Sequence, residues 1–244
     1  MLSRTYGFPV DADMPLWLFP DDTCLKAHPC YTAAKAGNVA AAVRLISDIA
    51  LSFLIENRHR LPADACYVAP HACEATGDNA IPQVLAQACA MIAGSEADTD
   101  IVQITRVFHT GADPMERIAT RADFEGLVKT DALHILVDDV TTMGGTLAEL
   151  ADFIQSKGGK IGGVVVIVNA GRVKNLRPSS SVIRKIENRH NHEIEKILGI
   201  QPAALTANEA NYLVGFRTSD EIRNRLVKAR QETDRRLRSK GIAG

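Results

Sequence analysis

The stretch HILVDDVTTMGGTL, which spans residues 134–147, decides the fold. Its first residues continue an apolar run from Leu133 to Val137 that is typical of a buried parallel strand. An acidic pair and a loop of small residues follow, and from Thr146 to Lys157 the apolar residues recur on one stripe of a helix. This order predicts a strand–loop–helix unit of an open parallel sheet, in which ligands bind beyond the carboxyl ends of the strands.

The loop between this strand and helix has the composition of a phosphate site. A helix N-terminus offers free backbone N–H groups and the positive end of the helix dipole. Gly144 and Gly145 let an anion approach the backbone closely, and the hydroxyls of Thr142 and Thr146 add further donors. A structural alternative stays open, because Thr146 and Glu149 have the spacing of a helix capping box.

The acid pair Asp138 and Asp139 calls for a different ligand group, since carboxylates repel a phosphate. The two side chains are suited to accept hydrogen bonds from the vicinal hydroxyls of a ribose, or to face a magnesium ion directly or through water. Acids at strand ends also cap turns, which is the structural alternative. Together, the loop and the acid pair predict a sugar-phosphate site.

Apolar periodicity and breaker residues predict further helices and strands on both sides of this unit. We expect helices at 38–58 with Asn38 as the N-cap, at a segment with Pro82 in its first turn, and at 181–198, 208–214 and 219–239. Further strands are expected at 65–69, 100–105 and 161–168, and loops at 70–79 and 106–121. Strands that alternate with helices predict a parallel sheet with right-handed crossovers.

The composition suits one α/β domain, because 46% of the 244 residues are hydrophobic and 23% are charged. We expect a core at about 38–170, an irregular N-terminal flank at 1–37 and a helical C-terminal extension at 171–244. The extension is expected to form a hood over the site or an oligomer contact.

Charge and cysteine content narrow the class of protein. The formal net charge of -1 and the pI near 6.7 give no general attraction to nucleic acid or to an anionic membrane. Five cysteines without a C-x-x-C pair argue against a disulfide framework or a zinc ribbon. With no signal-peptide run and only strand-sized apolar stretches, we expect a cytoplasmic protein with no membrane contact.

Two other patterns carry less weight. His190 and His192 would point apart on a helix, which argues against a metal site. The basic segment 221–240 is typical of a solubilising helix, with an oligomer contact or a nucleic-acid patch as alternatives.

Residues 134–147 resemble the ribose-5-phosphate motif of type I phosphoribosyltransferases: four apolar residues, two acids, and a loop that closes on threonine. The resemblance implies a type I phosphoribosyltransferase-like parallel sheet flanked by helices. It also implies that Asp138 and Asp139 hold the ribose hydroxyls of phosphoribosyl pyrophosphate (PRPP), with Mg²⁺ as cofactor. The residues implied for the 5-phosphate are Thr141, Thr142, Met143, Gly144, Gly145 and Thr146. Met143 departs from the usual threonine or alanine.

Two further segments fit the layout of this family less specifically. The segment after the strand at 65–69 stands where relatives cradle the pyrophosphate, which implies the residues Pro70, His71, Thr76 and Gly77. The segment 106–121 stands where relatives have a mobile catalytic loop, and it looks like the arginine-bearing loop of the competence-associated members. Arg106, Arg117 and Arg121 are therefore candidates to neutralise the leaving diphosphate.

The resemblance implies a magnesium-dependent enzyme that transfers the phosphoribosyl group of PRPP to a nitrogenous base and releases pyrophosphate. The alternative is a non-catalytic regulatory protein that senses PRPP. The expected partners are PRPP, a small-molecule acceptor and a second copy of the chain, whereas nucleic acid is not expected. The acceptor would lie against the chain ends, where Trp17, Phe19 and Tyr212 are stacking candidates unless they belong to the core.

Overall fold

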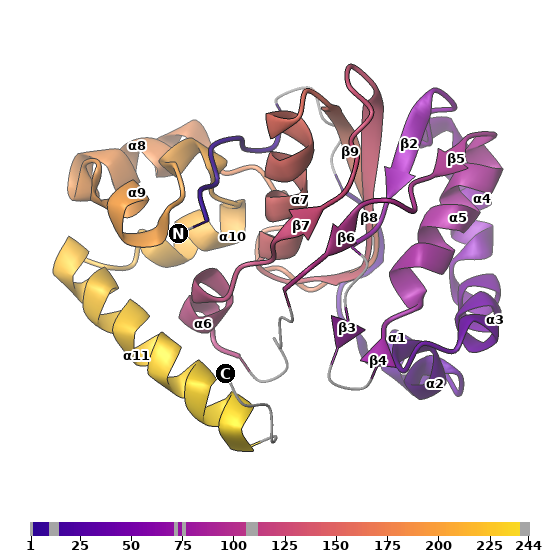
Figure 1. The fold of residues 1–244 in the computed structure, drawn as a ribbon, viewed down its shortest axis with the longest axis horizontal. Helices are drawn as coiled ribbons and strands as arrows, with labels where there is room; N and C mark the ends of the chain where they lie inside the picture. Colours follow the sequence, from indigo (N-terminus) through magenta and orange to yellow (C-terminus); the bar gives the residue numbers. More distant parts are fainter. Residues whose placement is uncertain (1, 10–14, 71–72, 75–76, 106–111, 240–244) are drawn as a thin grey trace.

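The protein is an α/β structure built on a five-stranded parallel sheet (Figure 1). The computed structural model describes residues 2–9, 15–70, 73–74, 77–105 and 112–239. In spatial order, the strands are β1 (Leu16–Phe19), β9 (Lys160–Asn169), β8 (Leu133–Thr141), β2 (Ala65–Val68) and β5 (Glu96–Ala97). The predicted parallel sheet flanked by helices is confirmed.

Helices cover both faces of the sheet (Figure 1). One face packs against α3 (Val39–Ile49), α4 (Leu51–Glu56) and α5 (Ile81–Ala93), and the other face packs against α7 (Gly145–Ser156). Side chains of β8 alternate between the two layers: Ile135 and Val137 lie on the α5 side, and Leu136 lies on the α7 side. The continuous apolar run of this strand is thus explained by burial on both faces.

The strand order reverses between β2 and β8. From β2 the chain passes through α5 to β5 on one side, whereas β8 lies on the other side of β2 and leads through α7 to β9. Such a reversal opens a crevice at the carboxyl ends of the two strands, where ligands of open α/β sheets bind. Val68, the last residue of β2, pairs with Leu136, so residues 137–141 of β8 extend beyond the end of β2.

The acid pair therefore lies within a strand, which corrects the prediction that the strand ends at Val137. The pairing of β8 with β9 continues to Thr141, which lies opposite Asn169. Sequence periodicity could not show this extension, because polar residues interrupt the apolar run while the neighbouring strand continues the hydrogen bonding.

The N-terminal flank is more regular than predicted. Strand β1 is an edge strand of the sheet, with Trp17 opposite Val166 of β9. Two short helices follow, α1 (Thr23–Ala27) and α2 (Tyr31–Lys35). A four-residue strand carries too little periodicity to be recognised, and its partner lies about 150 residues away in the sequence, so only tertiary pairing defines it.

Several other predicted elements are broken or displaced. The helix predicted at 38–58 is interrupted at Ala50 between α3 and α4, and the 3₁₀ turn η1 (Arg58–Arg60) follows. The strand predicted at 100–105 is only β6 (Val102–Gln103), which pairs antiparallel with β7 (Phe124–Glu125) outside the main sheet. The loop predicted at 106–121 contains the helix α6 (Pro114–Ala119). The loop predicted at 70–79 contains a ribbon of β3 (Cys73–Glu74) and β4 (Gly77–Asp78).

The C-terminal extension forms a helical layer beside α7 (Figure 1). Its elements are α8 (Ser180–His190), α9 (Glu193–Leu198), the 3₁₀ turn η2 (Pro202–Ala204), α10 (Ala207–Leu213) and α11 (Ser219–Ser239). The helix predicted at 181–198 is split at Asn191, which has a φ of 48°. The extension has its own apolar cluster, which also takes in Met115 and Ile118 of α6.

The basic helix α11 packs against α6, and acids neutralise part of its charge. Arg225 forms an ion pair with Asp113, and Arg223 forms ion pairs with Asp220 and Glu193. Among the described residues, no helix combines the length and the hydropathy needed to cross a membrane.

His134 is a fully buried polar residue at the start of β8. Its Nδ1 lies 3.0 Å from the carbonyl oxygen of Ala132 and 3.3 Å from that of Lys160. Because carbonyl oxygens only accept, Nδ1 carries a proton and donates to them. Burial lowers the pKa of His134 below the ordinary value of 6.5.

We expect His134→Leu to reduce the pH dependence of stability. In the wild type, the unfolded chain takes up a proton at this ring as the pH falls through about 6.5, whereas the folded chain does so only at lower pH. The free energy of unfolding should therefore fall by about 1 kcal/mol more in the wild type than in the variant between about pH 7.5 and about pH 5.5. Urea unfolding at the two pH values measures this difference, and parallel pH profiles would contradict the lowered pKa of His134.

Candidate functional site

The loop between β8 and α7 forms one end of the candidate site. Gly144 is the N-cap of α7 and has a φ of 78°, in the left-handed region that favours glycine. Within the described part of the chain, no side chain caps the first turn of α7, and no acidic residue lies in that turn. The structural alternative, in which Thr146 and Glu149 form a capping box, is therefore wrong. The backbone amides in the first turn of α7 remain available to an anion.

Close packing holds this loop in place. The backbone carbonyl of Met143 accepts a hydrogen bond of 2.6 Å from Oγ1 of Thr206, which precedes α10. A Cβ at Gly144 would lie 2.9 Å from Cδ2 of Leu176. Oγ1 of Thr141 is buried without a hydrogen-bond partner among the described residues, and it would lie 3.7 Å from the same Cβ. The loop thus combines uncapped helix amides with a buried hydroxyl that an added hydrogen-bonding group would satisfy.

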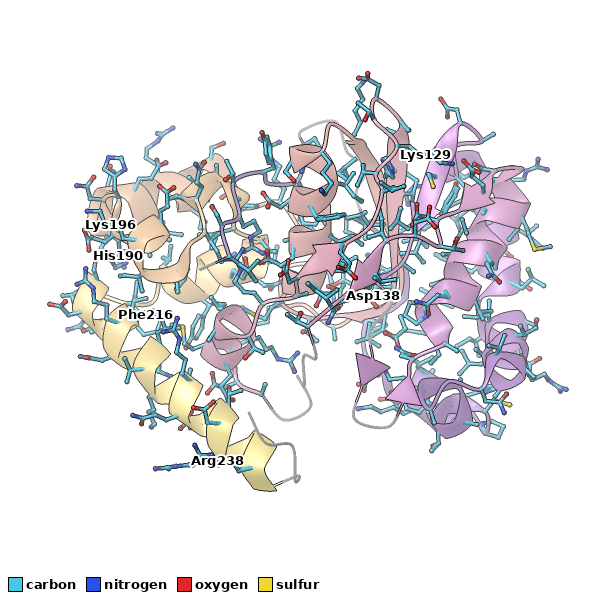
Figure 2. All side chains as sticks on the ribbon, viewed as in Figure 1. Lys129, Asp138, His190, Lys196, Phe216 and Arg238 are labelled. Carbon is cyan, nitrogen blue, oxygen red and sulfur yellow. The ribbon has the colours of Figure 1, made fainter. Side chains whose placement is uncertain are left out.

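The acid pair forms the other end of the candidate site. Asp138 is half-buried near the centre of the molecule, and Asp139 is buried (Figure 2). Oδ2 of Asp139 lies 3.1 Å from Nζ of Lys35 and 3.2 Å from Nδ2 of Asn79. Burial, followed by the neighbouring charge of Asp139, raises the pKa of Asp138 well above its ordinary value. The two carboxyl groups are therefore close enough to influence each other, and the ammonium group of Lys35 forms an ion pair with Asp139.

Lys35 and Asn79 are site residues that sequence reasoning missed. Asn79 lies two residues before the start of α5, and its Oδ1 accepts a hydrogen bond of 3.2 Å from the backbone N–H of Ile81. An asparagine before a helix with a proline in its first turn is a recognisable capping signal, which could have marked this position. Lys35 lies at the end of α2, in the flank predicted to be irregular, and no local pattern identifies it.

The acid pair predicted to face magnesium accepts hydrogen bonds from groups of the protein. Oδ1 of Asp138 accepts from the backbone N–H of Asp139 at 2.8 Å, and both oxygens of Asp139 already accept hydrogen bonds. Elsewhere among the described residues, carboxylate oxygens of Asp113, Glu116 and Glu232 gather within 4.8 Å of one another. Asp113 there caps α6 and pairs with Arg225, so helix capping and ion pairing account for the cluster.

The described arginines of the segment 106–121 have different roles. Nη1 of Arg117 donates to Oγ1 of Thr142 at 3.1 Å, so this arginine lies at the loop between β8 and α7. Arg121 donates from Nε and Nη2 to Glu149 at 2.6 and 2.7 Å, and it borders a cleft of 390 Å³ between α6, α9 and α11. The geometry therefore supports a ligand contact for Arg117 and a structural role for Arg121. Arg106 lies outside the described residues.

The segment expected to cradle pyrophosphate is described in part. Pro70 is buried after β2, and its carbonyl oxygen lies 3.5 Å from Nε2 of Gln83. Gly77 begins β4 and pairs with Glu74 of β3. His71 and Thr76 lie outside the described residues.

The three candidate stacking residues belong to packed regions. The Trp17 ring packs on the α7 side of the sheet, with Nζ of Lys174 5.3 Å from its centroid, and Phe19 packs on the α5 side. Tyr212 makes an edge-on contact with Phe216, with 5.3 Å between ring centroids, in the cluster of the extension. The alternative that these aromatic side chains are core residues is the one that the structure supports.

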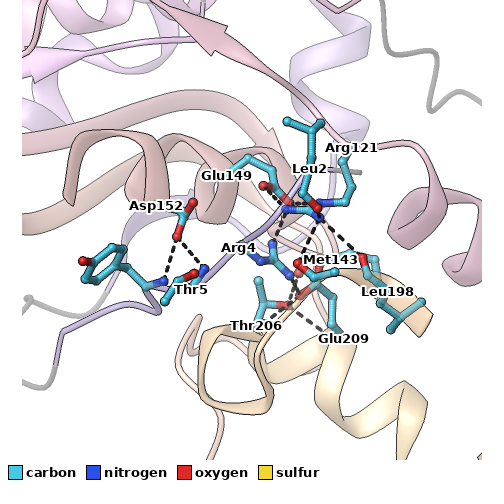
Figure 3. Close-up of polar contacts among 12 residues, drawn as sticks. Leu2, Arg4, Thr5, Arg121, Met143, Glu149, Asp152, Leu198, Thr206 and Glu209 are labelled. Carbon is cyan, nitrogen blue, oxygen red and sulfur yellow. Dashed lines mark hydrogen bonds and ion pairs between the residues drawn. The ribbon is translucent and has the colours of Figure 1, made fainter. Parts of the chain in front are cut away.

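A buried charge network fixes the extension behind the loop (Figure 3). The guanidinium of Arg4 is fully buried, 2.5 Å from Oε2 of Glu209 on α10 and 3.3 Å from Oε1 of Glu149 on α7. Glu149 also pairs with Arg121 at 2.6 Å. Backbone N–H of Arg4 donates to the carbonyl of Gly199 at 2.8 Å, so the N-terminal segment lies between α7 and the extension.

Comparison with known proteins gives two relatives and no family. No protein-family model matches the chain. The chain is 34% identical over 222 residues to Protein TraN of Escherichia coli, an alignment that covers 87% of this chain and 49% of TraN. It is 35% identical over 130 residues to an uncharacterized protein of Haemophilus influenzae, which covers 52% of this chain and 29% of that protein. The chain thus spans about half or less of the length of the curated relatives it matches.

We expect Arg4→Met to lower the free energy of unfolding by about 3 to 5 kcal/mol, because it leaves buried carboxylates without their counter-charge. Urea denaturation measures the change. Arg44→Met is the matched control, since Arg44 forms an exposed pair with Asp48 at 2.8 Å, and its loss should leave stability unchanged within error. Equal stabilities of the two variants would show that the buried network contributes little.

Proposed function

We propose that this chain binds PRPP in the crevice between β2 and β8 and is a phosphoribosyltransferase of the type I fold. The observation that carries the proposal is the site at the reversal of strand order. There an uncapped helix N-terminus and an acid pair lie at opposite ends of residues 138–146. A ribose 5-phosphate has a dianionic group at one end and vicinal hydroxyls at the other, which is the complementary arrangement.

The 5-phosphate would lie against the loop. The first-turn amides of α7, the hydroxyls of Thr141 and Thr142, and the guanidinium of Arg117 supply its donors. Each hydrogen bond to a charged oxygen contributes about 1.5 to 3 kcal/mol, so four such bonds suffice for micromolar affinity after the cost of association.

The ribose would lie over the acid pair. Asp138 and Asp139 would accept from its hydroxyls and orient the anomeric carbon toward the connection that follows β2. In the transfer, the bond between the anomeric carbon and the diphosphate oxygen breaks. Its electron pair leaves with pyrophosphate, and a nitrogen nucleophile bonds to the carbon from the opposite face. Magnesium brought in with the diphosphate supplies charge neutralisation on the leaving group.

The residues of this chain contribute mainly position and electrostatics. Little covalent chemistry is needed from the protein, because the loop fixes the phosphate and the acids fix the ring. The rate would then depend on cations near the diphosphate and on the exclusion of water from the anomeric carbon.

We expect Thr141→Val to weaken PRPP binding by about tenfold or more while leaving the protein as stable as the wild type or more stable. Valine has nearly the same shape as threonine, and the substitution removes a buried hydroxyl that has no partner among the described residues but would donate to the phosphate. Isothermal titration with PRPP and Mg²⁺ measures binding, and thermal unfolding without ligand measures stability. Unchanged affinity would place the phosphate elsewhere, and absence of PRPP binding by the wild type would refute the proposal.

Turnover separates an enzyme from a PRPP sensor. We expect pyrophosphate release when the chain is incubated with PRPP, Mg²⁺ and a panel of nucleobases, with at least one base raising the rate above the rate of PRPP hydrolysis. A coupled pyrophosphate assay measures this rate. Asp138→Asn, which changes a side chain placed on the ribose, is the matched inactive variant. Tight PRPP binding without base-dependent release would instead identify a regulatory protein.

A further inference from the structure

Lys35 connects the N-terminal flank to the candidate site. It is the last residue of α2, more than 100 positions before the acid pair, and its Nζ lies 3.1 Å from Oδ2 of Asp139. Its side chain is 20% exposed, whereas that of Asp139 is 6% exposed, so the ammonium group lies at the open side of a buried carboxylate. Among the described residues, Lys35 is the lysine that contacts the acid pair.

The backbone fixes this position. The carbonyl of Ala34 accepts a hydrogen bond of 3.1 Å from the backbone N–H of Ala80, which ties the end of α2 to the start of α5. Asn79, the residue before Ala80, donates to the same Asp139 oxygen as Lys35 does. The connection from β2 to α5, the end of α2 and the acid of β8 thus meet at one place.

Two described cations, Arg117 and Lys35, contact opposite ends of the site. Arg117 contacts Thr142 in the loop that would hold the 5-phosphate, and Lys35 contacts Asp139 on the ribose side. In a ribofuranose, the ring oxygen lies between the anomeric carbon and C4, and C4 carries the CH2 group that bears the 5-phosphate. A diphosphate on the anomeric carbon therefore points away from the loop and toward the β2 connection, where Lys35 lies.

From this geometry we infer that Lys35 is a binding residue for the anomeric diphosphate of PRPP. The inference rests on the proposed function and specifies which end of the ligand this residue recognises. An ammonium group has three N–H donors, so it can keep Asp139 as one acceptor and take a diphosphate oxygen as another. Asn79 continues to hold Asp139 when Lys35 turns toward the ligand.

The charges around the acid pair also favour Lys35 as a contact of the diphosphate. A diphosphate brought near Asp138 and Asp139 meets two carboxyl groups, and Lys35 is a cation in contact with Asp139. The 5-phosphate meets no carboxylate in the first turn of α7, so it has less need of this lysine. Removal of the lysine charge should therefore weaken a ligand that carries the diphosphate far more than a ligand that lacks it.

The test compares two ligands on one set of variants by isothermal titration in Mg²⁺. PRPP carries the diphosphate, and ribose 5-phosphate lacks it. Lys35→Gln removes the charge but keeps a donor for Asp139, so the fold is retained. We expect this variant to lose about tenfold or more in PRPP affinity and less than about threefold in ribose 5-phosphate affinity. Lys35→Arg should restore most of the PRPP affinity.

Two further variants complete the design. Lys26→Met is the matched control, since Lys26 lies on α1 with a 58% exposed side chain and pairs with Asp22, and it should bind both ligands as the wild type does. Arg117→Met should weaken both ligands, because Arg117 lies at the loop. Equal effects of Lys35→Gln on the two ligands, or no effect on either, would overturn the assignment of Lys35 while leaving PRPP binding intact. Failure of the wild type to bind either ligand would overturn the proposed function and this inference together.

Discussion

The buried pairing of Arg4 with Glu149 and Glu209 is the interaction on which the rest of the structure depends. With Arg121 added, the network holds two guanidinium groups and two carboxylates, so its formal charges cancel. Burial raises the pKa of Glu149, and the two arginines oppose that rise. A buried charge cluster adds little net stability, but the loss of one partner is strongly destabilising. The cluster therefore serves to specify one arrangement of the segments that it joins.

The helices that this network joins pack behind the loop between β8 and α7. Glu149 is on α7, and Glu209 is on α10, one helix turn after Thr206, whose hydroxyl holds the Met143 carbonyl. A Cβ at Gly145 would lie 3.2 Å from Oε1 of Glu209, which leaves little space behind the loop. The extension therefore supports the loop structurally, whatever further contacts it makes. A loop that is already held in place loses little conformational entropy when it binds a ligand.

The sequence predicted the parts of the site that are local. The strand–loop–helix unit at 134–157 was predictable because its apolar period, its glycines and its threonines lie within one continuous segment. The helix α6 was also recognisable, since Asp113, Pro114 and Glu116 form a capping-box signature that the structure shows to be complete. Recognition of that helix would have separated Arg117, which points to the loop, from Arg121, which points to Glu149.

The remaining parts depend on contacts between distant segments. Strand β1 is defined by β9, and Lys35 belongs to the site because α2 is tied to the start of α5. The hydrophobic periodicity of a segment does not predict such long-range contacts. A single lysine in the N-terminal flank is also compatible with an ordinary solvent-exposed position. The part of β8 beyond Val137 also depends on a distant segment, because its hydrogen-bonding partner is β9.

The path of the N-terminal segment also has a consequence for biosynthesis. Arg4 and Glu209 are separated by 205 positions, and the backbone of Arg4 is bonded to residues 199 and 201. On a ribosome, the segment around Arg4 can reach its final place only after residues 199–209 have been translated. Strands β2, β8 and β9 can assemble before that, so the N-terminal segment would be inserted last, as the step that closes the fold. A bulky fusion at residue 1 should therefore slow that step more than a fusion at residue 244.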